Sequence, residues 1–306
     1  MSAPVVVRGN HSHLFGPSML PVLEELFMSS YEQHPSRREV LFQTKQTDRD
    51  IWQYSSIEDM DLFVQMSEGQ EYDYKRPKQG ASKTLSILKY GLGASISQET
   101  IDDGKFDLAA DIVRKMGRSA RETKEISAMN VFNNGFSSET TADGLSLFNA
   151  AHTMPSGGTF RNVLATDADL SPSSLDQALA DFETQFVGDS GIIELIRPEI
   201  LLVSPNQKRY AKELVGSDLK PDSAENNMNS LKGEGLMVVA SPHLTDPDAW
   251  FLLSSKANHG LRIINRADVQ TKSEVDFDRD AIKYKSMYRE IIGAVHGKGV
   301  FGSDGV

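Results

Sequence analysis

The residue with the clearest chemical potential in this sequence is a single histidine. His152 stands in GLSLFNAAHTMPSGGTF, residues 144–160, after an apolar run and before a pair of glycines. An imidazole on a glycine-rich loop could act as a general acid or base, or as a metal ligand. The sequence shows no neighbour that would orient the ring, and a lone histidine beside a turn is more often structural. We therefore expect a hydrogen-bonding structural residue, and we retain a hydrolase that uses His152 as an alternative.

The other motifs with chemical potential are incomplete. The seven histidines form no HxxxH or HExxH pair, and the chain has no cysteine, so thiolate metal sites, disulfides and cysteine nucleophiles are excluded. QGASKT, residues 79–84, lacks the glycine spacing of a phosphate-binding loop, and YGLGASIS, residues 90–97, lacks the third glycine of a dinucleotide fingerprint. We expect no catalytic residues, no metal and no cofactor, and hence no enzyme.

Composition is typical of a soluble globular protein: 306 residues, of which 39% are hydrophobic and 25% charged. No apolar run is long enough for a membrane span, and the first residues lack a secretory signal, so we expect a protein made in a cytoplasm, without a membrane. The formal net charge of −11 opposes a dedicated nucleic-acid reader, which needs basic patches on its surface. It does not exclude a protein that lies beside DNA.

Apolar spacing predicts a helix over residues 18–33 and a much longer helix over residues 99–136. Asn133, Asn134 and Gly135 supply a stop signal for the long helix. In the long helix the residues expected to form the buried stripe are Leu108, Ile112, Met116, Ala120, Ile126 and Met129.

Between these helices the pattern is extended. Residues 40–57 and 83–97 are strand-like, and the polar, charged stretch between them predicts a long β-hairpin or flap.

After residue 160 helices and strands alternate, which predicts an α+β protein. Residues 170–186 and 206–216 are expected to be helices, and residues 198–205 a buried strand. Residues 235–244 and 249–255 predict a pair of strands joined by the turn TDPD. The last segment alternates: Ile282, Tyr284 and Tyr288 should face the core from a long strand.

Residues 100–153 carry a resemblance to a known family. An acidic entry to the long helix and an asparagine- and glycine-rich exit are followed by the pattern DG-x-x-x-F-x-x-x-H, which is formed by Asp143, Gly144, Phe148 and His152. This order resembles the major head (capsid) subunits of tailed phages of the Mu-like prophage group. The similarity extends from about residue 60 to residue 300.

The resemblance implies the HK97-like phage capsid fold. By position, it implies an N-terminal arm (1–38), an extended loop (39–97), a peripheral domain with the spine helix (98–171 and 266–306) and an axial domain (172–265). It also implies that flap residues contact a neighbouring subunit; the candidates are Glu71, Tyr72, Asp73, Tyr74, Lys75 and Arg76. Tyrosine and arginine are enriched at interfaces.

The function that the resemblance implies is assembly. Copies of the chain would form pentamers and hexamers of an icosahedral head that encloses double-stranded DNA without sequence specificity. The expected partners are further copies, a portal, and scaffolding or decoration proteins, and the expected location is the virion, after assembly in the bacterial cytoplasm. A nanocompartment shell of the same fold is the alternative. Lys75, Lys78 and Lys83 are candidates for a covalent cross-link, but the sequence pairs none of them with an asparagine.

Overall fold

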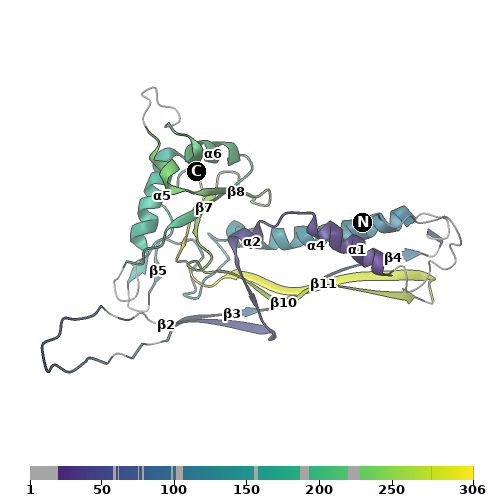
Figure 1. Ribbon diagram of the computed structural model, residues 1–306, viewed down its shortest axis with the longest axis horizontal. Helices are drawn as coiled ribbons and strands as arrows, with labels where there is room; N and C mark the ends of the chain where they lie inside the picture. Colours follow the sequence, from purple (N-terminus) through teal and green to yellow (C-terminus); the bar gives the residue numbers. More distant parts are fainter. Residues whose placement is uncertain are drawn as a thin grey trace. The chain divides into compact units, whose positions relative to one another are not determined.

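The computed structural model divides the chain into two compact units (Figure 1). It describes residues 20–57, 60, 62–74, 76–77, 79–97, 99–100, 106–154, 158–186, 193–219, 228–276 and 278–305. Unit 1 comprises Met1–Ser36, Ile87–Glu125 and Asn265–Glu290, and unit 2 comprises Arg37–Ser86, Ile126–Ile264 and Ile291–Val306. One long helix and two long strands therefore each contribute residues to both units.

Unit 1 is built from helices that pack on a sheet. Its helical part is α1 (Leu20–Glu32) and most of α4 (Phe106–Asn133). Its sheet part is β4 (Leu88–Ser97) with most of β10 (Leu261–Asp276) and of β11 (Ala281–Ala294). In the strand order β1-β10-β11-β4 the remaining strand, β1 (Gln43–Gln46), belongs to unit 2. β4 and β11 are antiparallel over ten pairs, from Ala281↔Ser97 to Glu290↔Leu88. Leu23 and Phe27 of α1 are fully buried in the core cluster, as the predicted amphipathic helix requires.

The buried stripe of α4 differs from the predicted one. Leu108 is 53% exposed and Ile126 is 43% exposed, so the prediction for these two residues is wrong. The buried residues that the first half of the helix contributes to the core cluster of unit 1 are Ala109, Val113 and Met116. Because an α-helix has 3.6 residues per turn, a stripe that steps by four drifts around the helix axis and leaves the core face. Steps that alternate between three and four stay on it.

Of the two longest strands in unit 1, β11 was predicted from the sequence and β10 was not. β11 buries Ile282, Tyr284 and Tyr288 and exposes Lys283 and Lys285, which confirms the predicted alternation. β10 was not predicted, although it is the longest strand at 16 residues. Only its first five residues are uniformly buried, and the rest alternates between half-buried and exposed side chains, most of them polar, so the hydrophobic signal is weak.

Unit 2 contains a mixed sheet of order β12-β9-β7-β8. Its strands are β7 (Pro198–Val203), β8 (Met237–Ala240), β9 (Trp250–Ser254) and β12 (Val300–Ser303). β7 is parallel to β8 and antiparallel to β9, so it lies between them. The predicted direct pairing of the β8 and β9 segments is wrong. Almost every residue of β7 is buried, which is the signature of a central strand that displaces β8 from β9.

Both faces of this sheet are covered. Ile200 and Leu202 of β7 face one hydrophobic cluster with the C-terminal end of α4, and Leu201 and Val203 face a second cluster. The second cluster includes residues of α5 (Pro172–Gln185) and α6 (Lys208–Gly216). α5 begins with a capping box between Ser171 and Ser174, as the Ser-Pro start predicts. Short helices α2 (Arg38–Leu41) and η2 (Ser230–Glu234) complete the helical elements described in this unit.

The flap is a two-stranded ribbon in unit 2. β2 (Ile51–Ile57) pairs antiparallel with β3 (Gln79–Ser86), and the described residues between them form no helix or strand (Figure 1). β4 belongs to the sheet of unit 1 and not to this ribbon. A second small ribbon pairs β5 (His152–Thr153) with β6 (Thr159–Phe160). Across all the described residues, no helix has the length and apolarity that crossing a membrane requires.

Gly117 sets the distance between α1 and α4. A Cβ at this position would lie 2.5 Å from the carbonyl oxygen of Phe27. Alanine favours an exposed helix interior by about 1 kcal/mol over glycine, but here it would force the two helices apart. We expect Gly117→Ala to lower the free energy of unfolding by about 1–3 kcal/mol in urea denaturation.

The control is Ser119→Ala, at an exposed position two residues further along the same helix. It should leave stability unchanged or raise it slightly. A Gly117→Ala protein as stable as the Ser119→Ala protein would contradict the close packing of α1 on α4.

Candidate functional site

His152 lies at the centre of a buried polar cluster in unit 2. Its side chain is fully buried, and its ring stacks on Phe160 with centroids 4.9 Å apart. Nδ1 lies 2.7 Å from the Asp143 Oδ2 atom, and Nε2 lies 3.1 Å from the carbonyl oxygen of Leu147. The expectation that no neighbour orients the ring is therefore wrong. Both ring nitrogens face acceptor oxygens, which leaves neither available to a substrate.

Asp143 is held by its own loop as well as by His152. It accepts hydrogen bonds from the Thr141 hydroxyl and from the Leu145 amide, the latter at 3.1 Å. Burial alone would raise the pKa of the Asp143 carboxyl, but the hydrogen bonds from His152 and Thr141 outweigh it and lower the pKa. Gly144 has φ 83°, a left-handed conformation that turns the chain directly after Asp143. Asp143 thus supplies the carboxylate, and the turn at Gly144 follows it directly in the chain and lets the loop place this carboxylate against His152.

Asn162 joins this cluster to the segment after β11. Its Nδ2 donates to the carbonyl oxygens of Leu147 at 2.7 Å and Gly297 at 3.1 Å, and its Oδ1 accepts from the Asn149 amide at 2.8 Å. The side chain is fully buried, so these bonds satisfy groups that water does not reach. Sequence analysis missed Asn162, because nothing in its neighbourhood distinguishes it from a loop asparagine.

Phe148 anchors the apolar side of the same loop. Its ring lies 4.9 Å from that of Phe136 and 5.1 Å from that of Phe251, measured between centroids. A Cβ on Gly135 would lie 2.6 Å from the Phe148 ring, so the glycine that ends α4 also makes room for the phenylalanine. All four residues of the DG-x-x-x-F-x-x-x-H pattern therefore position this loop. Ser156 and Gly157, which precede β6 in the chain, lie outside the described residues.

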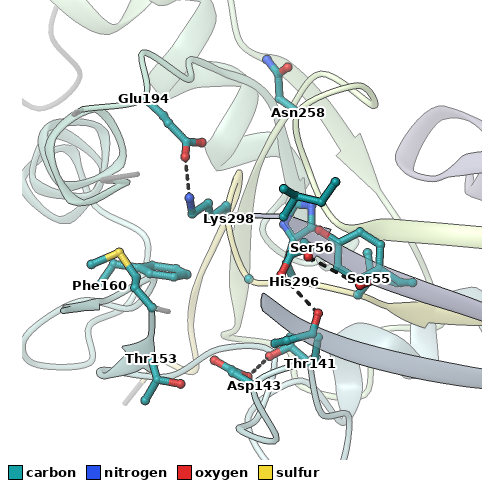
Figure 2. A pocket seen from close by; sticks show the side chains of 17 residues that line it. Ser55, Ser56, Thr141, Asp143, Thr153, Phe160, Glu194, Asn258, His296 and Lys298 are labelled. Carbon is teal, nitrogen blue, oxygen red and sulfur yellow. Dashed lines mark hydrogen bonds and ion pairs between the residues drawn. The ribbon is translucent and has the colours of Figure 1, made fainter. Parts of the chain in front are cut away.

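A pocket of about 460 Å³ opens beside this cluster (Figure 2). The flap base, the Asp143 loop and the segment after β11 line it. Figure 2 shows Lys298 directed at Glu194, with which it forms an ion pair, and Asp143 hydrogen-bonded to Thr141. The described residues contain no group of three or more histidine, aspartate or glutamate side chains that could hold a metal ion. The lining therefore offers hydroxyls, the Asp143 carboxylate, the His296 ring and one ion pair.

Two histidines near this pocket are held in their neutral form. Burial, together with the positive charges of Arg262 and Lys298, lowers the pKa of His296 to about 3. Burial and the charges of Arg262 and Lys256 lower the pKa of His259 to about 4. Within the described structure, no hydrogen-bond partner lies near His296 Nδ1 or His259 Nε2. Arg262 supplies no hydrogen-bond acceptor to these two rings. Its guanidinium donates to backbone carbonyls, including that of His259 at 2.6 Å.

Lys83, one of the three candidate cross-linking lysines, is engaged within the subunit. Its Nζ lies 3.1 Å from Glu139 Oε1, donates to the Ala294 carbonyl at 2.9 Å and also contacts the Thr140 carbonyl. Glu139 Oε1 in turn accepts from the Ala294 amide at 3.1 Å. This arrangement fixes the base of β3 to its own unit. Lys75 and Lys78 lie outside the described residues.

The candidate contact residues of the flap lie apart from the buried cluster. Glu71, Tyr72, Asp73, Tyr74 and Arg76 are exposed, and Tyr72 and Tyr74 are 72% and 87% exposed. Lys75 lies outside the described residues.

Sequence analysis missed a second exposed group in the same loop. It consists of apolar side chains, and Phe63 is the most exposed at 105%. Its members are Ile57, Met60, Leu62, Phe63 and Val64. Five apolar residues within eight positions of a polar loop were a readable signal.

Comparison with known proteins identifies the family. A family model described as phage capsid protein matches residues 80–301, which is most of the chain. The chain belongs to the phage capsid protein family. Among curated protein sequences, no match was found.

Solved structures show the same fold at low sequence identity. The capsid structure of the cyanophage P-SCSP1u has a TM-score of 0.59 and 11% identity, covering 88% of this chain and 87% of that chain. A virus-like particle from Pyrococcus furiosus has a TM-score of 0.57 and 12% identity, covering 93% and 99%. The mature capsid of bacteriophage PhiM1 has a TM-score of 0.54 and 12% identity, covering 88% and 86%. The HK97-like phage capsid fold is thereby confirmed.

Family membership decides between the classes of function. This phage capsid protein is a structural major capsid subunit of the virion and not an enzyme, so the hydrolase alternative is set aside. The His152 ring is buried and both of its nitrogens lie against oxygen atoms of the same subunit, which agrees with that conclusion. Membership of the Mu-like group within the family stays a prediction.

Removal of the Asp143 carboxylate tests the role of the buried cluster. Asp143→Ala leaves a buried histidine nitrogen without its acceptor, which costs about 1–3 kcal/mol. We expect that loss in the free energy of unfolding, measured in urea. Asp176→Ala, which removes an exposed carboxylate from α5, is the control and should leave stability almost unchanged. An equal effect of the two substitutions would show that Asp143 does not position His152.

Acid should destabilise unit 2 through His259 and His296. Their pKa values in the folded chain lie below the ordinary value of about 6.5, so the unfolded chain binds protons first as the pH falls. The stability that the neutral rings maintain is fully present above about pH 6.5; it is lost as the pH falls from there to about 4 for His259 and to about 3 for His296. Each histidine contributes a slope of at most about 1.4 kcal/mol per pH unit.

His296→Gln removes one titrating group from the cluster. Its free energy of unfolding should therefore fall less steeply from about pH 7 to about pH 5 than that of the parent chain. Ser119→Ala removes no titratable group and should keep the parent slope. Equal slopes for all three proteins would show that the buried rings do not control acid stability.

Proposed function

We propose that copies of this chain assemble into pentamers and hexamers of a closed icosahedral head that encloses double-stranded phage DNA. The observation that carries the proposal is the family match over residues 80–301, together with a fold shared with capsids such as that of the cyanophage P-SCSP1u, at a TM-score of 0.59. Closed symmetry repeats each subunit contact many times, so modest contacts suffice to hold a shell.

The exposed apolar side chains of the flap support association with a neighbour. Leu62, Phe63 and Val64 are 71%, 105% and 80% exposed. A protein that acts alone rarely leaves a contiguous apolar group of this kind in water, and such groups mark interaction sites. Tyr72 and Tyr74 extend the same loop with amphipathic rings that suit an interface. The flap thus combines exposed apolar side chains, which can anchor it on a neighbour, with more polar side chains beside them.

We assign the parts of the coat fold by position. Residues 1–38 form the N-terminal arm, residues 98–171 with 266–306 the peripheral domain, and residues 172–265 the axial domain. The extended loop was expected over residues 39–97. The pairing of β4 with β11 supports an earlier end for this loop, near Ser86, with β4 in the peripheral domain.

Other components of a head belong to the same proposal. A portal occupies one vertex, and scaffolding or decoration proteins act during or after assembly. The net charge of −11 supports contact with packaged DNA that is non-specific and weak, because like charges repel. Virions would be completed in the bacterial cytoplasm.

Electron microscopy tests the proposal. The purified full chain, or a lysate that contains it, should show shells or capsomer-sized particles. A monomer under every condition of salt, pH and protein concentration would overturn it.

A shell that encloses protein instead of DNA is the second candidate, favoured by the likeness to the virus-like particle from Pyrococcus furiosus, which covers 99% of that chain. Nuclease-protected DNA inside purified particles supports the head, and a co-purifying enzyme in DNA-free particles supports the nanocompartment.

A further inference from the structure

The sheet of unit 1 has a basic strip on the face that points away from α4. On the inner face Tyr90 of β4 lies opposite Tyr288 of β11, and the Lys124 amine of α4 lies 4.5 Å from the centre of the Tyr288 ring. Because side chains alternate along a strand, the residues next to these tyrosines point to the outer face. The opposed pairs that form the basic strip there are Lys89↔Arg289, Gly91↔Met287, Gly93↔Lys285 and Ser95↔Lys283.

The positive charge of the strip is not balanced by acids. β4 contains no acidic residue, and the only one in β11, Glu290, is buried and paired with Lys124 on the inner face. Within the described part of the chain, Lys89, Lys285 and Arg289 form no ion pair. The exposed residues of β10 carry charges of both signs, so the basic strip is confined to β4 and β11.

Two features of the strip oppose the stability of the chain. Lys89 lies directly opposite Arg289, and like charges at opposed positions of an antiparallel pair destabilise it. The buried Nε atom of Arg289 has no hydrogen-bond partner among the described residues. A bound anion would offset the repulsion and supply acceptors for the guanidinium.

The glycines leave the floor of the strip without side chains. Gly93 is exposed and is not among the glycines with positive φ. A Cβ on Gly93 would make only ordinary contacts, 3.5 Å from the Tyr284 carbonyl oxygen and 3.6 Å from Lys285 Cβ. Neither the backbone nor the packing therefore requires glycine here. Glycine inside a strand weakens it and often marks a place where a ligand approaches the backbone closely.

Double-stranded DNA fits this surface better than a protein partner does. Lys285 and Arg289 are four residues apart on one strand, about 13 Å at about 3.3 Å per residue. That is about the rise of four nucleotides along one DNA strand, at about 3.4 Å each. A protein partner would be expected to meet apolar or aromatic anchors, and Met287 is the one apolar side chain of the strip.

We propose that the basic strip binds the phosphate backbone of packaged double-stranded DNA through Lys89, Lys285 and Arg289. This assignment rests on the proposed function, and it locates on one surface the contact with DNA that net charge alone leaves unplaced. The contact is independent of base sequence, because phosphates carry no sequence information. It is weak, because the chain as a whole is acidic.

The salt dependence of DNA binding by the purified full chain tests the proposal. Binding to a short labelled duplex of mixed sequence is measured by fluorescence anisotropy at several salt concentrations. The logarithm of the association constant falls with the logarithm of salt by about 0.9 per phosphate contact, so Lys285→Gln should make the slope shallower by about 0.9. Gly93→Val keeps every charge and should weaken binding several-fold while the urea midpoint stays the same or rises, because valine favours strands.

The matched control is Lys115→Gln, which removes an exposed lysine from α4 in the same unit. It should keep the parent slope. An equal loss of slope in this control, or a parent chain that binds no duplex at low salt, would overturn the assignment. Polyglutamate that displaces the duplex at equal charge concentration would assign the strip to an acidic protein and would overturn it as well.

Purified particles provide a second measurement. Acetylation of amines, followed by mass spectrometry of the peptides, should modify Lys89 and Lys285 less in DNA-filled particles than in DNA-free ones, and Lys115 equally in both. Equal modification of Lys89 and Lys285 in particles that contain DNA would overturn the assignment while the proposed function stands. Absence of any shell or capsomer from the parent chain would overturn both proposals.

Discussion

Burial of both faces of the central strands β7 and β9 is the constraint on which unit 2 depends. Alternate residues of β7 point into different hydrophobic clusters, so one strand connects the end of α4 with the helices α5 and α6. Such strands are buried on both faces, so apolar side chains predominate in them. Because both clusters share β7, a substitution that shifts the strand in one cluster also displaces side chains of the other. The subunit gains a rigid body from this arrangement, which a repeated building block requires.

The polar groups in unit 2 are organised around that apolar body. Asp143, His152 and Asn162 satisfy one another and the backbone of their loop, so their burial is compensated. His259 and His296 follow another principle, since burial beside Arg262 keeps them neutral. The first group specifies a loop conformation, and the second is tolerated only while the rings carry no proton.

The surfaces of the chain contrast with its interior. The flap exposes Phe63 and its apolar neighbours, and the edge strand β4 exposes Leu88 and Leu92. Neither feature buries apolar surface within the described chain, and exposed groups of this kind are typical of interaction sites. The hydrophobic clusters hold the subunit together, whereas we propose that exposed loops make the contacts that hold the shell together.

The sequence by itself determined the elements with strong periodic signals. The buried alternation of β11, the capped helix α5, the apolar strand β7 and the class of the fold could all be predicted, because local spacing reports which face of an element is buried. The order of residues 143–152 also pointed to the family.

Only the tertiary structure decided how distant segments meet. It inserted β7 between β8 and β9, and it left Leu108 outside the core although its spacing suited a stripe. It placed Asp143 against His152 across a turn that spacing does not reveal, and it made β4 a strand of unit 1. The physical reason is that strand pairing and side-chain contacts between residues far apart depend on packing competition among all the elements, whereas periodicity records only whether a residue faces an interior and not which one.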